Sequence, residues 1–203
     1  MKEHLLEAAE RAINKLVADF QGNPDRFWNE RDLHWSLFYR LKQENAVQED
    51  YATQLIRAEF PTLKKFGEST PARGHYDLVV LEPSSVIGAD VKDIPSWAPW
   101  SDWLPKVKLL VAVEIKLWLA RLPIDRADWD IQKLTESPNN IQNAYFLNFV
   151  QLNFKRQQMK DYYRDLRRYL MDLKARFPPL KILCAPNEVR VQPNPRENWL
   201  SLS

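Results

Sequence analysis

The run LLVAVEIKLWL, residues 109 to 119, decides the fold of this chain. It is shorter than the roughly 18 apolar residues that cross a membrane, and its composition predicts a buried strand from Lys108 to Leu119. Glu114 and Lys116 interrupt the apolar run, and residues two apart in a strand point to the same side, so both charged side chains project together. Burying an unpaired charge costs several kcal/mol. A catalytic metal site is the sharpest explanation for the two charges.

The apolar periodicity of the rest of the chain predicts an α/β fold with helices around a mixed sheet, in which a meander comes first and a crossover later. The expected helices cover 3–19, a segment capped by Asn29 that runs to Gln43, 49–54, a segment from Arg126 to Glu136 capped by Asp125, and 155–177. The expected strands cover 55–60, 75–81, 108–119, 144–151 and 180–185. Residues 84–106 hold three prolines and three tryptophans and predict an insertion with little regular structure.

Composition predicts one globular domain. The chain has 203 residues, of which 45% are hydrophobic, enough for a substantial core. The opening MKEHLLEAAERAINKL mixes charges with apolar residues, unlike the apolar centre of a signal peptide. We therefore expect a soluble protein in the cytoplasm, with no membrane partner. Cys184 lies in an apolar run and can form no internal disulfide, which favours core packing in a reducing compartment.

The formal net charge is only +2, so the overall charge does not indicate a polyanionic partner. Residues 155–176 are locally basic, because eight Lys or Arg face three acids there. Two interpretations remain open for this segment. It is either a solvated helix face with ion pairs three or four residues apart, or a surface that contacts phosphates.

A second acid can join the charged triplet. Asp77 begins the expected strand 75–81, and pairing with the strand 108–119 would bring it beside Glu114, although one sequence cannot fix the register. Ile115 would offer its carbonyl nearby, and Glu30 lies on the apolar side of the preceding helix. Oxygen ligands without a Cys/His cluster favour Mg²⁺, with Mn²⁺ able to substitute. The alternative is an ordinary Glu-x-Lys pair on an exposed strand edge, worth at most about 1 kcal/mol.

These residues carry a resemblance to a known group of enzymes. Asp77 at the start of one strand, Glu114-x-Lys116 on the next and Glu30 on a preceding helix resemble the PD-(D/E)XK nuclease superfamily, over roughly residues 28 to 185. The stretches 56–62, 74–81 and 130–134 resemble uncharacterised members of that group. The superfamily's Pro before the aspartate is here Tyr76.

The resemblance implies a restriction-endonuclease-like core in the order αβββαβ. It also implies a Mg²⁺ site with Asp77, Glu114 and the Ile115 carbonyl as ligands, Lys116 as the catalytic lysine and Glu30 as an auxiliary acid. Three residues are possible accessories near this site: His75, His34 and Lys133.

The leading hypothesis is a magnesium-dependent nuclease that acts on DNA rather than RNA, and the resemblance adds a homodimer as an expectation. The residues proposed to contact the nucleic-acid backbone are those of the basic segment 155–176 and the loop residues Lys64, Lys65 and Arg73. The second hypothesis is a non-catalytic interaction module on the same fold, with the Trp-rich insertion as its contact surface.

Overall fold

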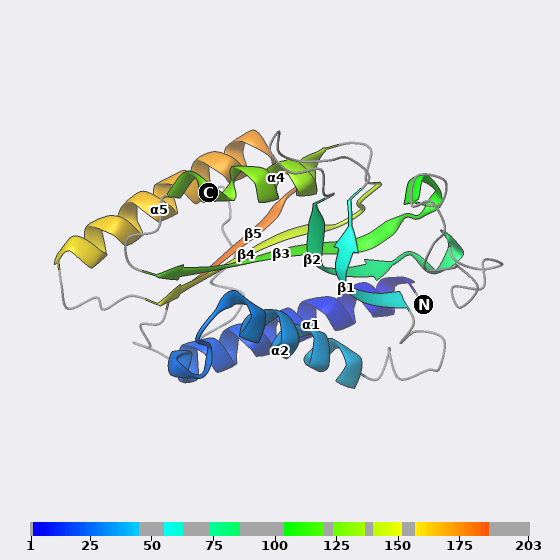
Figure 1. Ribbon diagram of the computed structural model, residues 1–203, viewed down its shortest axis with the longest axis horizontal. Coiled ribbons are helices and arrows are strands. Elements are labelled where there is room, and N and C mark those ends of the chain that lie inside the picture. Colours follow the sequence, from blue (N-terminus) through cyan, green and yellow to red (C-terminus); the bar gives the residue numbers. More distant parts are fainter. Residues whose placement is uncertain are drawn as a thin grey trace.

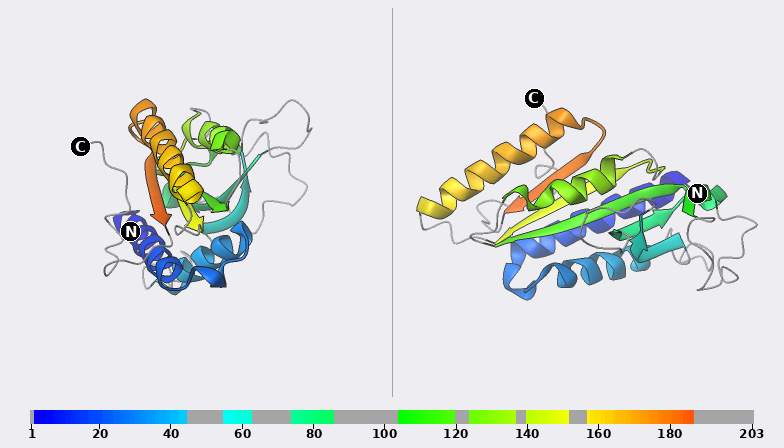
Figure 2. Two further views of the ribbon diagram at one scale, coloured as in Figure 1. Left: turned by 90° about the vertical axis from the view of Figure 1, so that its left-hand side faces the viewer. Right: turned by 45° about the horizontal axis from the view of Figure 1, so that its top comes forward.

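A five-stranded mixed sheet lies between two layers of helices (Figure 1). The computed structural model describes residues 2–44, 55–62, 74–85, 104–119, 124–136, 140–151 and 157–186. Helices α1 (Lys2–Gly22) and α2 (Glu30–Gln43) cover one face of the sheet, and α4 (Asp128–Thr135) and α5 (Gln157–Arg176) cover the other (Figure 2). The predicted α/β fold with a mixed sheet between helices is confirmed.

The strands follow one another across the sheet in the order of the chain. They are β1 (Ile56–Pro61), β2 (His75–Leu81), β3 (Leu109–Leu119), β4 (Ala144–Gln151) and β5 (Lys181–Pro186). β1, β2 and β3 form an antiparallel meander, whereas β3, β4 and β5 are parallel and are connected through α4 and α5. The predicted meander followed by a crossover is confirmed.

β3 holds the centre of the core because helices cover both of its faces. Ten of its eleven residues are buried or half-buried, and only Leu119 at its end is exposed. Asn148 of β4, directly opposite Lys116, is fully buried and accepts a hydrogen bond of 2.8 Å from the Trp118 indole. Its amide donates to the carbonyls of Phe146 and Leu183, so this polar side chain is satisfied inside the core. Cys184 is buried in β5, as predicted.

Local sequence explains where α2 begins. The Asn29 side chain accepts from the Asp32 backbone N–H, which confirms Asn29 as the predicted cap, and the Asp32 carboxylate accepts from the Asn29 N–H in return. Leu33, Leu37 and Leu41 then face the core at helical spacing. This start fixes Glu30 in the first turn and His34 in the second, both near β3.

The predicted start of the following helix, at Arg126 directly after Asp125, is wrong. Residues Ile124–Ala127 form a 3-10 turn, and α4 starts at Asp128. The residue before α4, Ala127, already has helical angles and offers no capping side chain. The chain is therefore turning before the α-helix begins, and no extended capping residue is needed.

Three sequence predictions lie outside the described residues: the short helix at 49–54, the middle of the insertion at 86–103 and the basic loop at 63–73. The described ends of the insertion, Pro83–Ser85 and Leu104–Lys106, are single 3-10 turns. Within the described ranges, no helix combines the length and the apolar character needed to span a bilayer.

Candidate active site

The strands β2 and β3 separate next to the charged triplet. Their pairing runs from Leu81 to Leu78, which lies opposite Val113, so the edge of β3 beyond this point is open to side chains. Asp77 uses this opening: its Oδ2 accepts a hydrogen bond of 2.6 Å from the Ile115 backbone N–H. Glu30 of α2 binds the same edge of β3 two residues further along, where its Oε1 accepts a hydrogen bond of 3.3 Å from the Leu117 backbone N–H. Two predicted site acids thus lie along one edge of β3.

Lys116 lies between acids from two helices. Its Nζ is 2.8 Å from Asp130 Oδ2 on α4 and 3.7 Å from Glu30 Oε2 on α2. Burial lowers the pKa of Lys116, but the Asp130 and Glu30 carboxylates outweigh it and raise the pKa above its ordinary value. Lys116 is therefore held as an ammonium ion at neutral pH.

Glu114 is the most deeply buried acid of the site, with 1% of its surface exposed. Its Oε2 is 2.8 Å from Lys133 Nζ on α4. Its Oε1 is buried and, among the described residues, has no hydrogen-bond partner. Burial and the neighbouring Asp77 raise the pKa of Glu114 well above its ordinary range, in spite of Lys133. The unsatisfied oxygen identifies a place where a cation or a water molecule would be stabilised.

Asp130 joins the two lysines into one group. Its Oδ1 is 2.8 Å from Lys133 Nζ, so the order of contacts is Glu114, Lys133, Asp130, Lys116 and Glu30, which we call the ion-pair chain. Burial by itself would raise the pKa of Asp130. The ammonium groups of Lys133 and Lys116 lower this pKa by more, so it lies below its ordinary value. The pKa of Lys133 is raised because Glu114 and Asp130 outweigh its burial.

α4 is docked on the start of β2 by two hydrogen bonds. The Tyr76 hydroxyl donates to the Lys133 carbonyl at 3.0 Å, and Lys133 Nζ donates to the His75 carbonyl at the same distance. Tyr76 is nearly fully buried, and burial raises its pKa strongly. The residue that departs from the superfamily pattern therefore positions the helix that carries Asp130.

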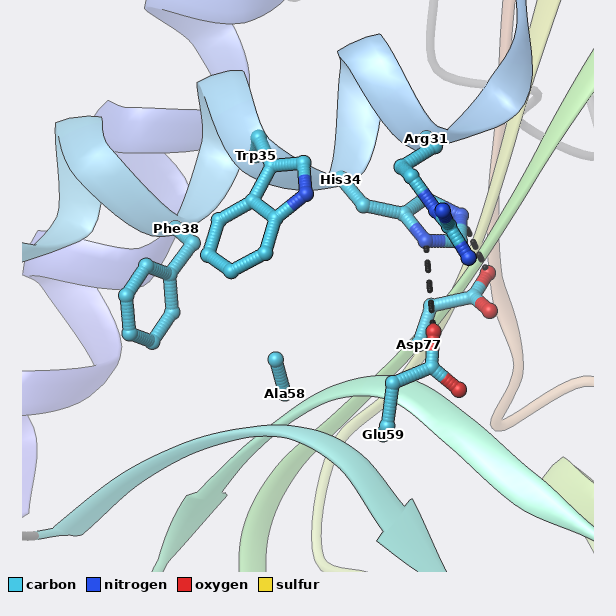
Figure 3. Close-up of a pocket in the computed structure, with 7 residues that line it drawn as sticks. All are labelled: Arg31, His34, Trp35, Phe38, Ala58, Glu59 and Asp77. Carbon is cyan, nitrogen blue, oxygen red and sulfur yellow. Dashed lines mark ion pairs between the residues drawn. The ribbon is translucent and has the colours of Figure 1, made fainter.

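A second group of possible ligands surrounds Asp77 on the α2 side (Figure 3). His34, Glu59 and Asp77 bring one ligand atom each to within 4.8 Å of the others. His34 Nε2 is 3.1 Å from Asp77 Oδ2, yet this nitrogen has no hydrogen-bond partner in the described part of the chain. Two ligands that bind one ion at right angles, each about 2.1 Å away, would be about 3.0 Å apart. His34 Nε2 and Asp77 Oδ2 are 3.1 Å apart but do not form a hydrogen bond, which is the arrangement expected of two atoms that bind the same ion.

Glu59 reaches this group because of an irregular backbone. Its φ of 51° lies in the left-handed region, between the register pairs Ala58 with Leu78 and Phe60 with Tyr76. Such distortions redirect a side chain and occur often beside active sites. The Glu59 carboxylate lies 3.9 Å from His34 Nδ1.

Some predicted contacts differ in the structure. The ion pairs that the structure gives Lys116 are with Asp130 and Glu30, whereas Glu114 is paired with Lys133. The Ile115 contact found is through its amide nitrogen, and its carbonyl as a metal ligand stays a prediction. The His75 side chain is exposed, and only its backbone carbonyl contacts the ion-pair chain.

Asp130 and Glu59 are the two residues that sequence reasoning missed. Asp130 had a detectable signal, because Asp130 and Lys133 are three residues apart on one helical face and both are buried. Glu59 had none, since its direction depends on the backbone at one residue.

Arg164 and Arg168 of the basic segment form ion pairs within their own helix, as the first of its two interpretations predicts, and contact of the segment with phosphates stays a prediction. Arg164 of α5 lies 3.1 Å from Asp161, and Arg168 lies 3.8 Å from Asp165, so these cations are paired within their own helix. α5 also covers the face of the sheet opposite α2 (Figure 1).

Comparison with known proteins adds no assignment: no family model, no curated protein and no solved structure matches this chain. A function must therefore be inferred from the geometry of the site.

Proposed function

We propose that this chain is a divalent-metal-dependent nuclease with a PD-(D/E)XK-type active site. The observation that carries the proposal is the 2.6 Å hydrogen bond from Ile115 N–H to Asp77 Oδ2, which brings the acid of β2 directly against the Glu114-Ile115-Lys116 triplet of β3. The order α2, β1, β2, β3, α4, β4 agrees with the restriction-endonuclease-like core αβββαβ. The pocket between α2, β1 and β2 that Asp77 lines offers space for a phosphodiester beside this acid.

The residues present fit a divalent cation. His34, Glu59 and Asp77 bring their ligand atoms close enough together to hold it, and Glu114 would join them by turning from Lys133 toward Asp77. Glu114 Oε1 and His34 Nε2, which have no hydrogen-bond partner among the described residues, support this set. When bound, such a cation polarises a phosphoryl oxygen and makes water more acidic. Imidazole nitrogen suits transition metals better than Mg²⁺, so we propose that Mn²⁺ supports activity at least as well as Mg²⁺.

Lys116 has a defined role in this proposal. Because Asp130 and Glu30 keep it protonated, it does not accept a proton from water at neutral pH. It instead orients the attacking water and stabilises the negative charge that develops on the phosphoryl group. Asp130 and Lys133 are positioning residues, since they hold Lys116 and Glu114 through direct ion pairs.

The proposal is tested by incubating the protein with plasmid, linear and single-stranded DNA, with RNA as comparison, in Mg²⁺, Mn²⁺ or a chelator. We expect cleavage of DNA that requires metal and is lost in Lys116→Ala and Asp77→Asn. Matched controls are Lys160→Ala and Asp161→Asn on α5, away from the site and not buried, which should cleave normally. Cleavage that survives in a Lys116→Ala/Asp77→Ala double variant contradicts the assignment.

One observation favours the alternative of a non-catalytic module. Lys133 already neutralises Glu114 at 2.8 Å, and a site satisfied in this way needs no metal ion. Calorimetric titration with Mn²⁺ separates the two proposals. Binding that is abolished by Glu114→Gln supports the nuclease, and absence of binding in the wild-type protein supports the module.

A further inference from the structure

The outer side of α2 exposes large aromatic rings. Trp35 is 49% exposed and Tyr39 is 61% exposed, whereas Leu33, Leu37 and Leu41 on the same helix are buried. Aromatic side chains of this size are normally mostly buried in a folded domain. Two exposed rings one helical turn apart therefore indicate a surface that binds something.

The rings support one another in fixed orientations. Trp35 contacts Phe38 with ring centroids 5.7 Å apart and nearly perpendicular planes, and it contacts Tyr39 at 6.1 Å. Phe38 and Tyr39 are also 6.1 Å apart. We call Trp35, Phe38 and Tyr39 the aromatic ridge. Rings held by each other lose little freedom when a planar group stacks on them.

The aromatic ridge is continuous with the proposed active site (Figure 3). A pocket of about 390 Å³ between α2 and the strands β1 and β2 is lined by Trp35 and Phe38 as well as by His34, Glu59 and Asp77. The remaining lining residues are Arg31 and Ala58. A ligand in this pocket therefore contacts the rings and the proposed metal ligands at the same time.

Cations lie at both ends of the aromatic ridge. Arg31 lines the pocket one helical turn before Trp35, about 6 Å along the axis, and the Lys42 ammonium lies 4.7 Å from the centre of the Phe38 ring. Rings with a cation at either end match a single nucleic-acid strand, because its bases can stack on the rings and its phosphates can bind the cations. In a duplex the base faces are already stacked on each other and cannot contact the rings.

We propose that α2 binds unpaired nucleotides, with bases stacked on Trp35 and Tyr39 and a phosphate held at Arg31 beside Asp77. The inference rests on the proposed nuclease function and names its substrate class as single-stranded nucleic acid or a single-stranded end. Phe38, which is half-buried and packs against the core, contacts both exposed rings.

Binding is measured with the full-length protein in a chelator, so that no cleavage occurs. The probes are a fluorescent 12-nucleotide single strand and the corresponding duplex, followed by anisotropy. We expect the single strand to bind more tightly than the duplex. Trp35→Ala and Tyr39→Ala should each weaken single-strand binding about five- to a hundredfold, whereas Trp35→Phe should retain most of it. The matched control is Trp129→Ala on α4, which is 51% exposed on the other face of the sheet and should bind normally.

The outcomes separate this inference from the proposed function. Lys116→Ala should lose cleavage but keep the preference for a single strand, so a protein that binds single strands through Trp35 without cutting them supports the ridge and not the nuclease. Equal binding of both probes, or a Trp35→Ala variant that binds and cuts like the wild type, overturns the inference. Absence of any oligonucleotide binding also overturns it and leaves the exposed rings for a protein partner.

Discussion

The ion pair between Lys133 and Glu114 gives the sharpest stability prediction, through the substitution Lys133→Met. The two side chains are 2.8 Å apart, and Glu114 is 1% exposed. Removing one partner of a buried pair leaves an uncompensated charge and costs about 3 to 5 kcal/mol. For a chain of this size each kcal/mol shifts the melting temperature by about 2 to 4 °C, so we expect a fall of roughly 6 to 20 °C at pH 8.

The same variant should respond to pH in a defined direction. Burial raises the pKa of Glu114 above its ordinary value of 4.5, and loss of Lys133 raises it further. A raised folded-state pKa gives stability that is complete below the unfolded-state pKa and is lost as pH rises through the folded-state pKa. The deficit of Lys133→Met relative to the wild type should therefore be smallest at acid pH, where Glu114 is protonated in both folded proteins. It should grow by up to about 1.4 kcal/mol per pH unit once the pH passes the folded-state pKa of Glu114 in the wild type.

The appropriate assay is urea denaturation over this pH range. It is carried out on the wild type, on Lys133→Met and on the double variant Glu114→Gln/Lys133→Met. The double variant has no buried charge at Glu114, so it should recover most of the stability that the single variant loses at pH 8. Equal losses in the single and double variants, or a loss that does not change with pH, would refute the reasoning.

Four other substitutions test separate parts of the structure. Asp130→Asn removes a charge-assisted contact to Lys116, the proposed catalytic lysine, and should slow the proposed cleavage about ten- to a hundredfold in a steady-state assay, unlike the control Asp161→Asn. His34→Ala should weaken Mn²⁺ more than Mg²⁺ in calorimetric titrations, and equal effects would contradict His34 as a ligand. Asn148→Ala removes the acceptor of the buried Trp118 indole N–H and two hydrogen bonds to backbone carbonyls, and should cost about 2 to 4 kcal/mol in urea denaturation. Burial by itself would raise the pKa of Glu44, but the hydrogen bonds from Lys15 and Arg11 outweigh burial and lower this pKa. Glu44→Gln should therefore destabilise the protein by about 1 kcal/mol above pH 5 and by less as the pH falls.

The sequence predicted the elements well because local periodicity and caps determine them. The strand 109–119 and the Asn29 cap are recognisable from neighbouring residues, and their bounds agree with the structure to within about two residues. The same locality explains the error at Asp125. A capping residue type was present, but it lies inside a 3-10 turn that no residue pattern in the neighbouring sequence had indicated.

The site was predictable in its members but not in its pairings. Strand period correctly separates Ile115 from Glu114 and Lys116, and the register of β2 brings Asp77 beside them. Which cation meets which acid depends on how α4 sits over the sheet, and one sequence carries no information on that distance. For this reason Lys133 was named only as an accessory, and the contact that Asp130 makes with Lys116 was missed.

The most direct test of the proposed metal site is anomalous diffraction from crystals soaked in Mn²⁺. The proposed nuclease requires a peak within about 2.3 Å of a carboxylate oxygen of Asp77, with Glu114 turned from Lys133 toward the ion. Crystals that bind Mn²⁺ elsewhere, or that leave Glu114 paired with Lys133 and no density at Asp77, would contradict it.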